Sequence, residues 1–337
     1  MRSLLFALCS LVLLAVLGLS LVLRGADWVA FASGTPEQIL AELQNLPSET
    51  GIHSVGEDQL TPLQYAIFHR ASAVAIQTLL EAGADPNDPM DSGIDPVQLA
   101  GSSYFVEGYT PLTFALSYGH DQAVSEALIE AGADIFVLTD LGRTTLHLAA
   151  DAGYSAEFLQ YLIDEGVAID AKDLFEFSAL LYASLSGYSV ENTQRLLDAG
   201  ADPNQRLMSG ATALMRTPFT PAMQALLNAG ADIHARDDDG KTALMHKTEA
   251  RHNNHEAVAF LLINGAELEA TDNLGRTALL HSAQNDPWPN AFDVLVSAGA
   301  NIHATDHKGQ DILFYASENH GFLKTESYQL LLKLLSE

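Results

Sequence analysis

Short runs of helix-spaced apolar residues alternate with polar turns along most of this chain. The clearest copy of the pattern lies between residues 139 and 172. In its first half, Leu146, Ala149 and Ala150 form one small apolar face, which indicates a helix that packs closely against a neighbour. Thr144 stands just before this face, and its hydroxyl can accept a hydrogen bond from the first turn. The pattern therefore predicts a capped helix that begins directly after this threonine.

A second helix is predicted directly after the first. Gly153 can end the first helix, because glycine adopts the left-handed conformation without steric cost. Phe158, Leu159 and Leu162 share one face of the second helix, and Gly166 closes it in the same way. A polar, turn-rich arm leads on to the next copy. The predicted unit is a helix, a turn, a second helix and an extended arm, and its apolar faces need a neighbouring unit to cover them.

The closing glycine and the motif that opens the first helix both recur along the chain. Most closing glycines follow one another at a step of about 34 residues. They are Gly83, Gly132, Gly166, Gly200, Gly230, Gly265 and Gly299. The opening motif is repeated as Thr61-Pro62-Leu63-Gln64, Thr110-Pro111-Leu112-Thr113, Thr144-Thr145-Leu146-His147, Ser178-Ala179-Leu180-Leu181, Thr212-Ala213-Leu214-Met215, Thr242-Ala243-Leu244-Met245 and Thr277-Ala278-Leu279-Leu280. A step of about 33 residues with a T-P-L-H-x-A motif is the signature of the ankyrin repeat.

On this period and these motifs, the chain resembles the ankyrin repeat family. The resemblance implies an all-α solenoid, an ankyrin repeat array of helix-turn-helix units with β-hairpin-like fingers. It also implies that proteins bind on the concave surface formed by the fingers and the first helices. The resemblance covers nearly everything after Ser33. We therefore expect an ankyrin repeat domain over residues 33–337, with about seven full repeats plus terminal caps.

The amino-terminal segment has a different character. Residues 4–23 form a long uncharged run, flanked by Arg2 and Arg24. About 20 apolar residues can cross a bilayer as a helix, whereas the apolar part of a secretory signal is usually about 7–15 residues long. Ala30-Phe31-Ala32 nevertheless has the form of a cleavage site. We expect an N-terminal hydrophobic helix that acts as a signal anchor within residues 1–32 and spans the membrane at about residues 4–23, with a cleaved signal peptide as the alternative.

The charges around this run predict its orientation. Arg2 and the amino terminus hold the front of the chain in the cytoplasm, whereas Arg24 is partly offset by Asp27. The repeats are then exported, and we expect them in a periplasm, tethered to the inner membrane by the N-terminal segment. Cys9 is the single cysteine, so the repeats carry neither a disulfide nor a thiol. An oxidising compartment is compatible with this composition.

The balance of charge restricts the partners. The chain has 43 Asp and Glu residues against 16 Lys and Arg residues, a net charge of −27. Such a surface repels phosphate backbones and anionic headgroups, so we expect no nucleic acid, and contact with the membrane only through the N-terminal segment. The excess of carboxylates either keeps a long array soluble or steers a basic protein partner toward it, and both interpretations stay open. We expect a monomer.

Two repeats depart from the regular period. The step from Gly83 to Gly132 leaves about 15 residues beyond the period in the arm after Gly83. The repeat that ends at Gly230 is four residues short and carries Pro218 and Pro221. Proline lacks the N–H donor and disfavours helix in the residue before it. The first helix of this repeat is therefore predicted to end early.

No catalytic, cofactor or metal site is predicted. The aspartates between residues 85 and 95 lack the spacing of an EF-hand loop. His252 and His255 are three residues apart, but an H-E-x-x-H motif is absent from the chain. A nucleophile elbow, a P-loop and a dinucleotide fingerprint are also absent from the sequence. We therefore expect no enzyme activity and no cofactor.

Large apolar residues in the arms are the candidates for binding a partner, because finger tips without a partner should be polar. The arm with Asp237-Asp238-Asp239 shows this ordinary composition. The candidate protein-binding residues are Tyr109, Tyr118, Phe136, Leu141, Leu174, Phe175 and Phe177. In the last of these arms, Glu176 replaces the usual glycine. Packing between neighbouring fingers is the alternative interpretation for each candidate.

Together these patterns predict a non-catalytic protein-binding scaffold that is displayed outside the cytoplasm. Its partner is expected to bind on the finger and first-helix surface. The alternative is an immunity or inhibitor protein that occludes a toxin or enzyme in the periplasm. A purely structural spacer is a third hypothesis.

Overall fold

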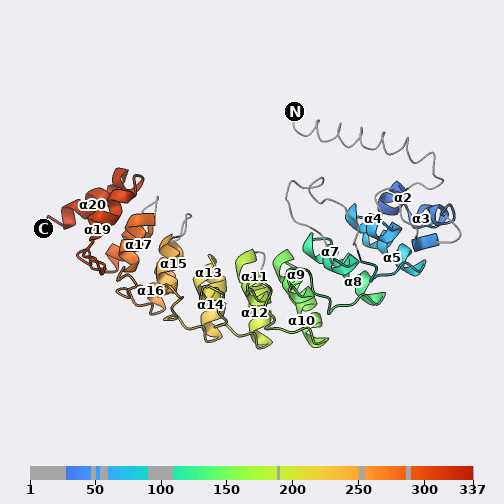
Figure 1. Cartoon of the computed structure of the whole chain (residues 1–337), viewed down its shortest axis with the longest axis horizontal. Helices are drawn as coiled ribbons and strands as arrows, with labels where there is room; N and C mark the ends of the chain where they lie inside the picture. The colour runs from blue at the N-terminus through green and yellow to red at the C-terminus, as the bar shows by residue number, and fades with distance from the viewer. Residues whose placement is uncertain are drawn as a thin grey trace. The chain divides into compact units, whose positions relative to one another are not determined.

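The computed structural model describes residues 28–46, 51–53, 60–89, 109–187, 190–249, 255–285 and 290–336. The chain divides into two compact units, unit 1 (Met1–Tyr154) and unit 2 (Ser155–Glu337). In Figure 1, unit 1 is coloured blue to green and unit 2 green to red. Both units consist of short helices joined by turns.

In unit 1, threonines cap the first helices of the repeats. Thr61 and Thr110 each accept a hydrogen bond from the backbone N–H three residues on. Thr144 caps its helix in the same way, and Gly153 ends that helix with a φ of 75°, so both predictions are confirmed. The helices of unit 1 are α2 (Val29–Ser33), α3 (Pro36–Leu43), η1 (Gly51–His53), α4 (Pro62–Phe68), α5 (Ala73–Glu81), α7 (Pro111–Ser117), α8 (Gln122–Glu130) and α9 (Thr145–Ala152).

Within unit 1, first helices stack on first helices and second helices on second helices. Helix α4 packs on α7 and α7 on α9, while α5 packs on α8 (Figure 1). Leu63, Leu112 and Leu146 occupy the same position of the three first helices, and all three are fully buried. The core is therefore a continuous layer between helices, which no single repeat could form alone.

Asn87 joins the first two repeats across the long step from Gly83 to Gly132. Its side-chain amide donates to the carbonyl of Gly132 at 2.9 Å, and its amide oxygen accepts the N–H of Asp134 at 2.7 Å. In unit 2, Asn204 makes the same two bonds to its own following repeat. The two repeats on either side of the long step are therefore joined by the same pair of asparagine hydrogen bonds as repeats at the normal spacing. Residues 90–108, which hold most of the additional length, lie outside the described residues.

The amino-terminal helix α2 is packed into unit 1. Phe31 is fully buried, and α2 contacts α3, α4 and α5. The ring of Trp28, just before this helix, meets the ring of Tyr65 edge-on at 5.8 Å. The predicted hydrophobic helix at residues 4–23 lies outside the described residues. Among the residues that are described, no helix is long and apolar enough to cross a membrane.

Unit 2 contains two rows of stacked helices (Figure 1). One row runs from α11 through α13, α15 and α17 to α19, and the other runs from α10 through α12, α14 and α16 to α18. At the end, Phe322 packs edge-on against Phe292 at 4.9 Å. The helices are α10 (Ala156–Asp164), α11 (Ala179–Ser186), α12 (Val190–Asp198), α13 (Ala213–Arg216), α14 (Thr220–Asn228), α15 (Ala243–Glu249), α16 (His255–Ile263), α17 (Ala278–Asn285), α18 (Asn290–Ser297), α19 (Ile312–Glu318), η2 (Phe322–Lys324) and α20 (Glu326–Leu334).

Helix α13 is only four residues long, which confirms the prediction from Pro218. Its carboxyl end is completed by a side chain from the next repeat. The ammonium of Lys247, on α15, donates to the carbonyls of Met215 at 2.8 Å and Thr217 at 2.6 Å. Lys247 is only 3 % exposed. A buried lysine thus replaces hydrogen bonds that a full-length helix would make within itself.

An aspartate holds the arm between α10 and α11 in place. Asp173 Oδ1 accepts the N–H groups of Phe175 and Phe177 at 2.8 and 2.9 Å, and its Oδ2 accepts the hydroxyl of Tyr182 at 2.7 Å. Three later arms repeat this arrangement with the pairs Asp237 and His246, Asp272 and His281, and Asp306 and Tyr315. Each of these four arms is therefore a turn that an aspartate side chain holds in place. We call every arm between the second helix of one repeat and the first helix of the next a finger.

The β-hairpin-like form implied by the family resemblance is only slightly developed. The described residues contain no strand and a single isolated antiparallel bridge, between Thr271 and Thr277. Each finger of unit 2 instead closes through two backbone bonds, as from Asp173 N to the carbonyl of Phe177 and from Glu176 N to the carbonyl of Asp173, both at 2.9 Å. The reason is that the aspartate side chain takes the N–H groups that a hairpin ladder would use.

Candidate functional site

Three of the seven candidate residues lie on the finger between α10 and α11. Leu174 and Phe175 form its tip and are 67 % and 52 % exposed. Phe177 is half-buried, and its ring lies 6.5 Å from that of Phe175 and 5.5 Å from that of Tyr182. Phe177 therefore supports the finger, whereas the ring of Phe175 is accessible to a partner.

The other four candidates lie in unit 1. Tyr118 stacks on the buried ring of Phe114 at 4.4 Å, and the half-buried Tyr109 meets the same ring at 6.4 Å. Burial raises the pKa of Tyr118, and the neighbouring Tyr109 adds to this effect. Phe136 is well exposed, whereas Leu141 is half-buried. The structure thus brings the two tyrosines together and places the other two residues separately on the arm that leads to α9.

The next finger of unit 2 has an apolar tip that was not among the sequence-predicted residues. Met208 is 74 % exposed. Lys172, from the preceding finger, donates to the carbonyl of Arg206 at 2.9 Å, so the two fingers are joined. Met208 follows Leu207, which stands where four other arms of unit 2 have their aspartate. Aligning the arms of the repeats position by position would have identified Met208 as a candidate. We call Leu174, Phe175 and Met208 the apolar tips.

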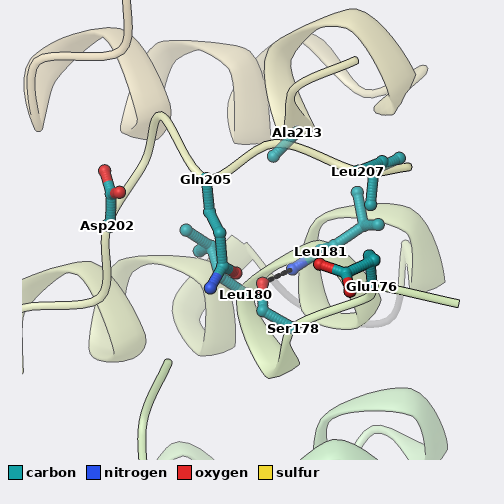
Figure 2. A pocket seen from close by; sticks show the side chains of 8 residues that line it. All are labelled: Glu176, Ser178, Leu180, Leu181, Asp202, Gln205, Leu207 and Ala213. Atoms are coloured by element: carbon teal, nitrogen blue, oxygen red, sulfur yellow. Dashed lines mark hydrogen bonds between the residues drawn. The ribbon is translucent and has the colours of Figure 1, made fainter. Parts of the chain in front are cut away.

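A small hollow lies between the first two fingers of unit 2 (Figure 2). It measures about 230 Å³ with the space that is open to solvent included. Most of this space is open solvent, and the enclosed part has room for about one water molecule. Its lining residues are Glu176, Ser178, Leu180, Leu181, Asp202, Gln205, Leu207 and Ala213.

A second cluster of ionisable groups lies between α15 and α17. His281 is fully buried, with Nε2 3.0 Å from Asp272 Oδ2 and Nδ1 2.9 Å from Glu249 Oε1. Burial alone would raise the pKa of Glu249, but the close imidazole of His281 and the hydrogen-bonded ammonium of Lys241 lower it to about 2. The imidazole is enclosed by its partners, so it ties two repeats together and does not face a substrate. In the described part of the chain, no group of three potential ligands is arranged to hold a metal ion.

Stacked helix pairs with a row of projecting fingers define a solenoid of the protein-interaction class. A family model described as ankyrin repeats in three copies matches residues 90–173, 112–207, 211–306 and 246–336. The chain belongs to the ankyrin repeat family. Ankyrin repeats form scaffolds for protein-protein interaction, typically without catalysis.

The fold has a counterpart among solved structures. The crystal structure of the human ASB11 ankyrin repeat domain superposes with a TM-score of 0.57 at 22 % sequence identity. The match covers 67 % of this chain and 97 % of that one. At this level of identity the likeness shows the fold alone. No curated protein matches the chain.

Proposed function

We propose that this protein binds a protein partner through the apolar tips of the first two fingers of unit 2. The observation that carries the proposal is the exposure of Phe175, which remains open to solvent on a finger whose other positions are fixed. An exposed aromatic ring held by a rigid support is the usual form of a binding hot spot. Three large exposed apolar side chains thus stand on two joined fingers, Leu174 and Phe175 on the first and Met208 on the second.

The contacts beneath the tip separate the side chains that pack within the finger from Phe175, which we propose binds the partner. Phe177 and Tyr182 hold the finger from within, and Asp173 fixes its backbone. The ring of Phe175 therefore has little to contribute to stability, because within the described residues it meets one other ring, edge-on, and is half exposed. A partner that covers this ring would bury it without having to order the finger first.

A matched pair of substitutions tests this proposal. Phe175→Ser is expected to weaken partner binding by about 2 kcal/mol, close to 30-fold in Kd, with little change in stability. Leu274 occupies the same position on a later finger and is 53 % exposed, so Leu274→Ser is the control. A photo-reactive residue placed at position 208 would capture the partner, and titration would then give each Kd. Equal effects of the two substitutions on the Kd would contradict the proposal.

We further propose that the repeats lie outside the cytoplasm, tethered by the N-terminal segment. The support is the apolar run at residues 4–23 and the charges beside it. A reporter enzyme that works only after export, fused behind Glu337, is expected to be active. The same reporter without residues 1–27 serves as the control and should be inactive. Activity of a cytosol-dependent reporter at the same position would contradict this location.

A further inference from the structure

Met208 differs from the other described methionines in its exposure to solvent. The chain has six methionines, and four of them, Met208, Met215, Met223 and Met245, lie among the described residues. Met208 is 74 % exposed, whereas the other three are 2 % exposed or less and belong to the core of unit 2. An oxidant in solution can therefore reach Met208 directly, but it meets the other three only when the repeats open.

The turn that carries Met208 is fixed by backbone hydrogen bonds on both sides. Within the finger, the N–H of Leu207 donates to the carbonyl of Ala211 at 2.9 Å. Toward the next finger, the carbonyl of Ser209 accepts the N–H of Asp238 at 3.0 Å. These bonds use the backbone on either side of Met208 and leave its side chain at the tip. The exposure of this thioether is therefore a property of an ordered turn.

Met208 is also the one member of the apolar tips that carries sulfur. The lone pair of a thioether attacks one oxygen of a hydroperoxide, so that an S–O bond forms while the O–O bond breaks. The sulfur gives up two electrons, the proton of the attacked oxygen passes to the leaving oxygen, and the peroxide becomes water or an alcohol. The product is methionine sulfoxide, which is polar. Oxidation therefore makes one apolar tip polar without moving it along the finger.

We infer that Met208 is a site of reversible oxidation by hydroperoxides, and that its sulfoxide form releases the protein partner from the apolar tips. The inference rests on the proposed function, because it names the regulation of the same site. A partner that covers Met208 packs apolar groups on its thioether, and a sulfoxide oxygen in that position loses its hydrogen bonds to water. The fold does not depend on this side chain, which is mostly exposed. Oxidation therefore changes binding and leaves unit 2 folded.

The first part of the test measures which methionines react. The full chain is treated with hydrogen peroxide, and mass spectrometry of its fragments gives the rate of sulfoxide formation at each methionine. Met208 is expected to react as fast as free methionine, and Met215, Met223 and Met245 at least about tenfold more slowly, because they wait for an opening of the repeats. The melting temperature should not change when Met208 alone is oxidised. Equal rates at Met208 and at the three buried methionines would overturn the inference.

The second part measures binding. Peptides without methionine are selected from a random library on phage against the untreated full chain, and those weakened by Phe175→Ser serve as probes. After treatment and removal of the peroxide, their Kd is expected to rise about tenfold, and methionine sulfoxide reductases should restore it. Met208→Gln, a polar side chain of similar length, should weaken the probes without any oxidant. Met208→Leu should bind them equally well before and after treatment.

The outcomes separate this inference from the proposed function. Probes that depend on Phe175 but bind the oxidised chain as tightly as the untreated one would overturn the inference alone. A loss of binding on oxidation that persists in Met208→Leu would overturn it as well, because another residue would then be responsible. Selected peptides that are all indifferent to Phe175→Ser would contradict the proposed function, and the inference with it.

Discussion

Alanine in place of Gly275 is expected to lower the free energy of unfolding of unit 2 by about 3 kcal/mol. Gly275 has a φ of 84°, which by itself strains any residue with a side chain by about 1 kcal/mol or more. In addition, a Cβ atom at this position would stand 2.9 Å from the backbone nitrogen of His307 on the next finger. That nitrogen donates to the carbonyl of Leu274 at 2.9 Å, so relief of the clash breaks a hydrogen bond between fingers.

Gly265 in the same repeat provides the matched control. Its φ is 94°, but a Cβ atom there would have no neighbour within 4 Å. Gly265→Ala should therefore show the conformational strain alone, about 1 kcal/mol. Urea unfolding followed by circular dichroism gives both values. If the two substitutions destabilise unit 2 equally, the fingers are not in close contact at Gly275.

The repeat architecture could be predicted because its signals are local. Thr144 and Gly153 mark the ends of α9 by capping chemistry that depends only on neighbouring residues. Pro218 shortens α13 for the same reason, since a missing donor acts at its own place in the chain. The period of about 34 residues then determines which helix meets which, because each repeat must cover the apolar face of the one before it.

The polar interior could not be predicted, because its partners come from different repeats. In the sequence, Lys247 looks like an ordinary solvent-exposed lysine on a helix. Its burial depends on α13 ending early, which exposes the carbonyls of Met215 and Thr217 to a donor from the next repeat. His281 is similar, as it pairs with Glu249 of the preceding repeat. Neither partner is visible without the stacking of the helices.

The candidate binding surface was only partly predictable for a related reason. Phe175 and Phe177 look alike in the sequence, two aromatic residues in one finger. The structure separates them, because Asp173 turns the backbone so that Phe177 packs on Tyr182 while Phe175 remains at the tip.

Substitution of Lys247 is expected to show how much its buried ammonium contributes to the free energy of unfolding. Lys247→Ala should lower the free energy of unfolding by about 3 kcal/mol, because it leaves two buried carbonyls without a donor and opens a cavity. Lys247→Met removes the charge and both donors but keeps most of the packing, so it should destabilise unit 2 less than Lys247→Ala does, by about 1–2 kcal/mol at neutral pH. Lys308, exposed on the last finger, gives the control substitution Lys308→Met.

The same lysine predicts how stability depends on pH. Burial, together with the smaller effect of the nearby charge of Arg216, lowers the pKa of Lys247 from 10.5 to about 7. Between these two values the unfolded chain binds the proton and the folded chain does not, so the free energy of unfolding rises with pH. The slope from pH 7 to pH 10 is at most about 1.4 kcal/mol per pH unit. The rise should persist in Lys308→Met and disappear in Lys247→Met, and its survival in the latter variant would mean that Lys247 stays charged throughout.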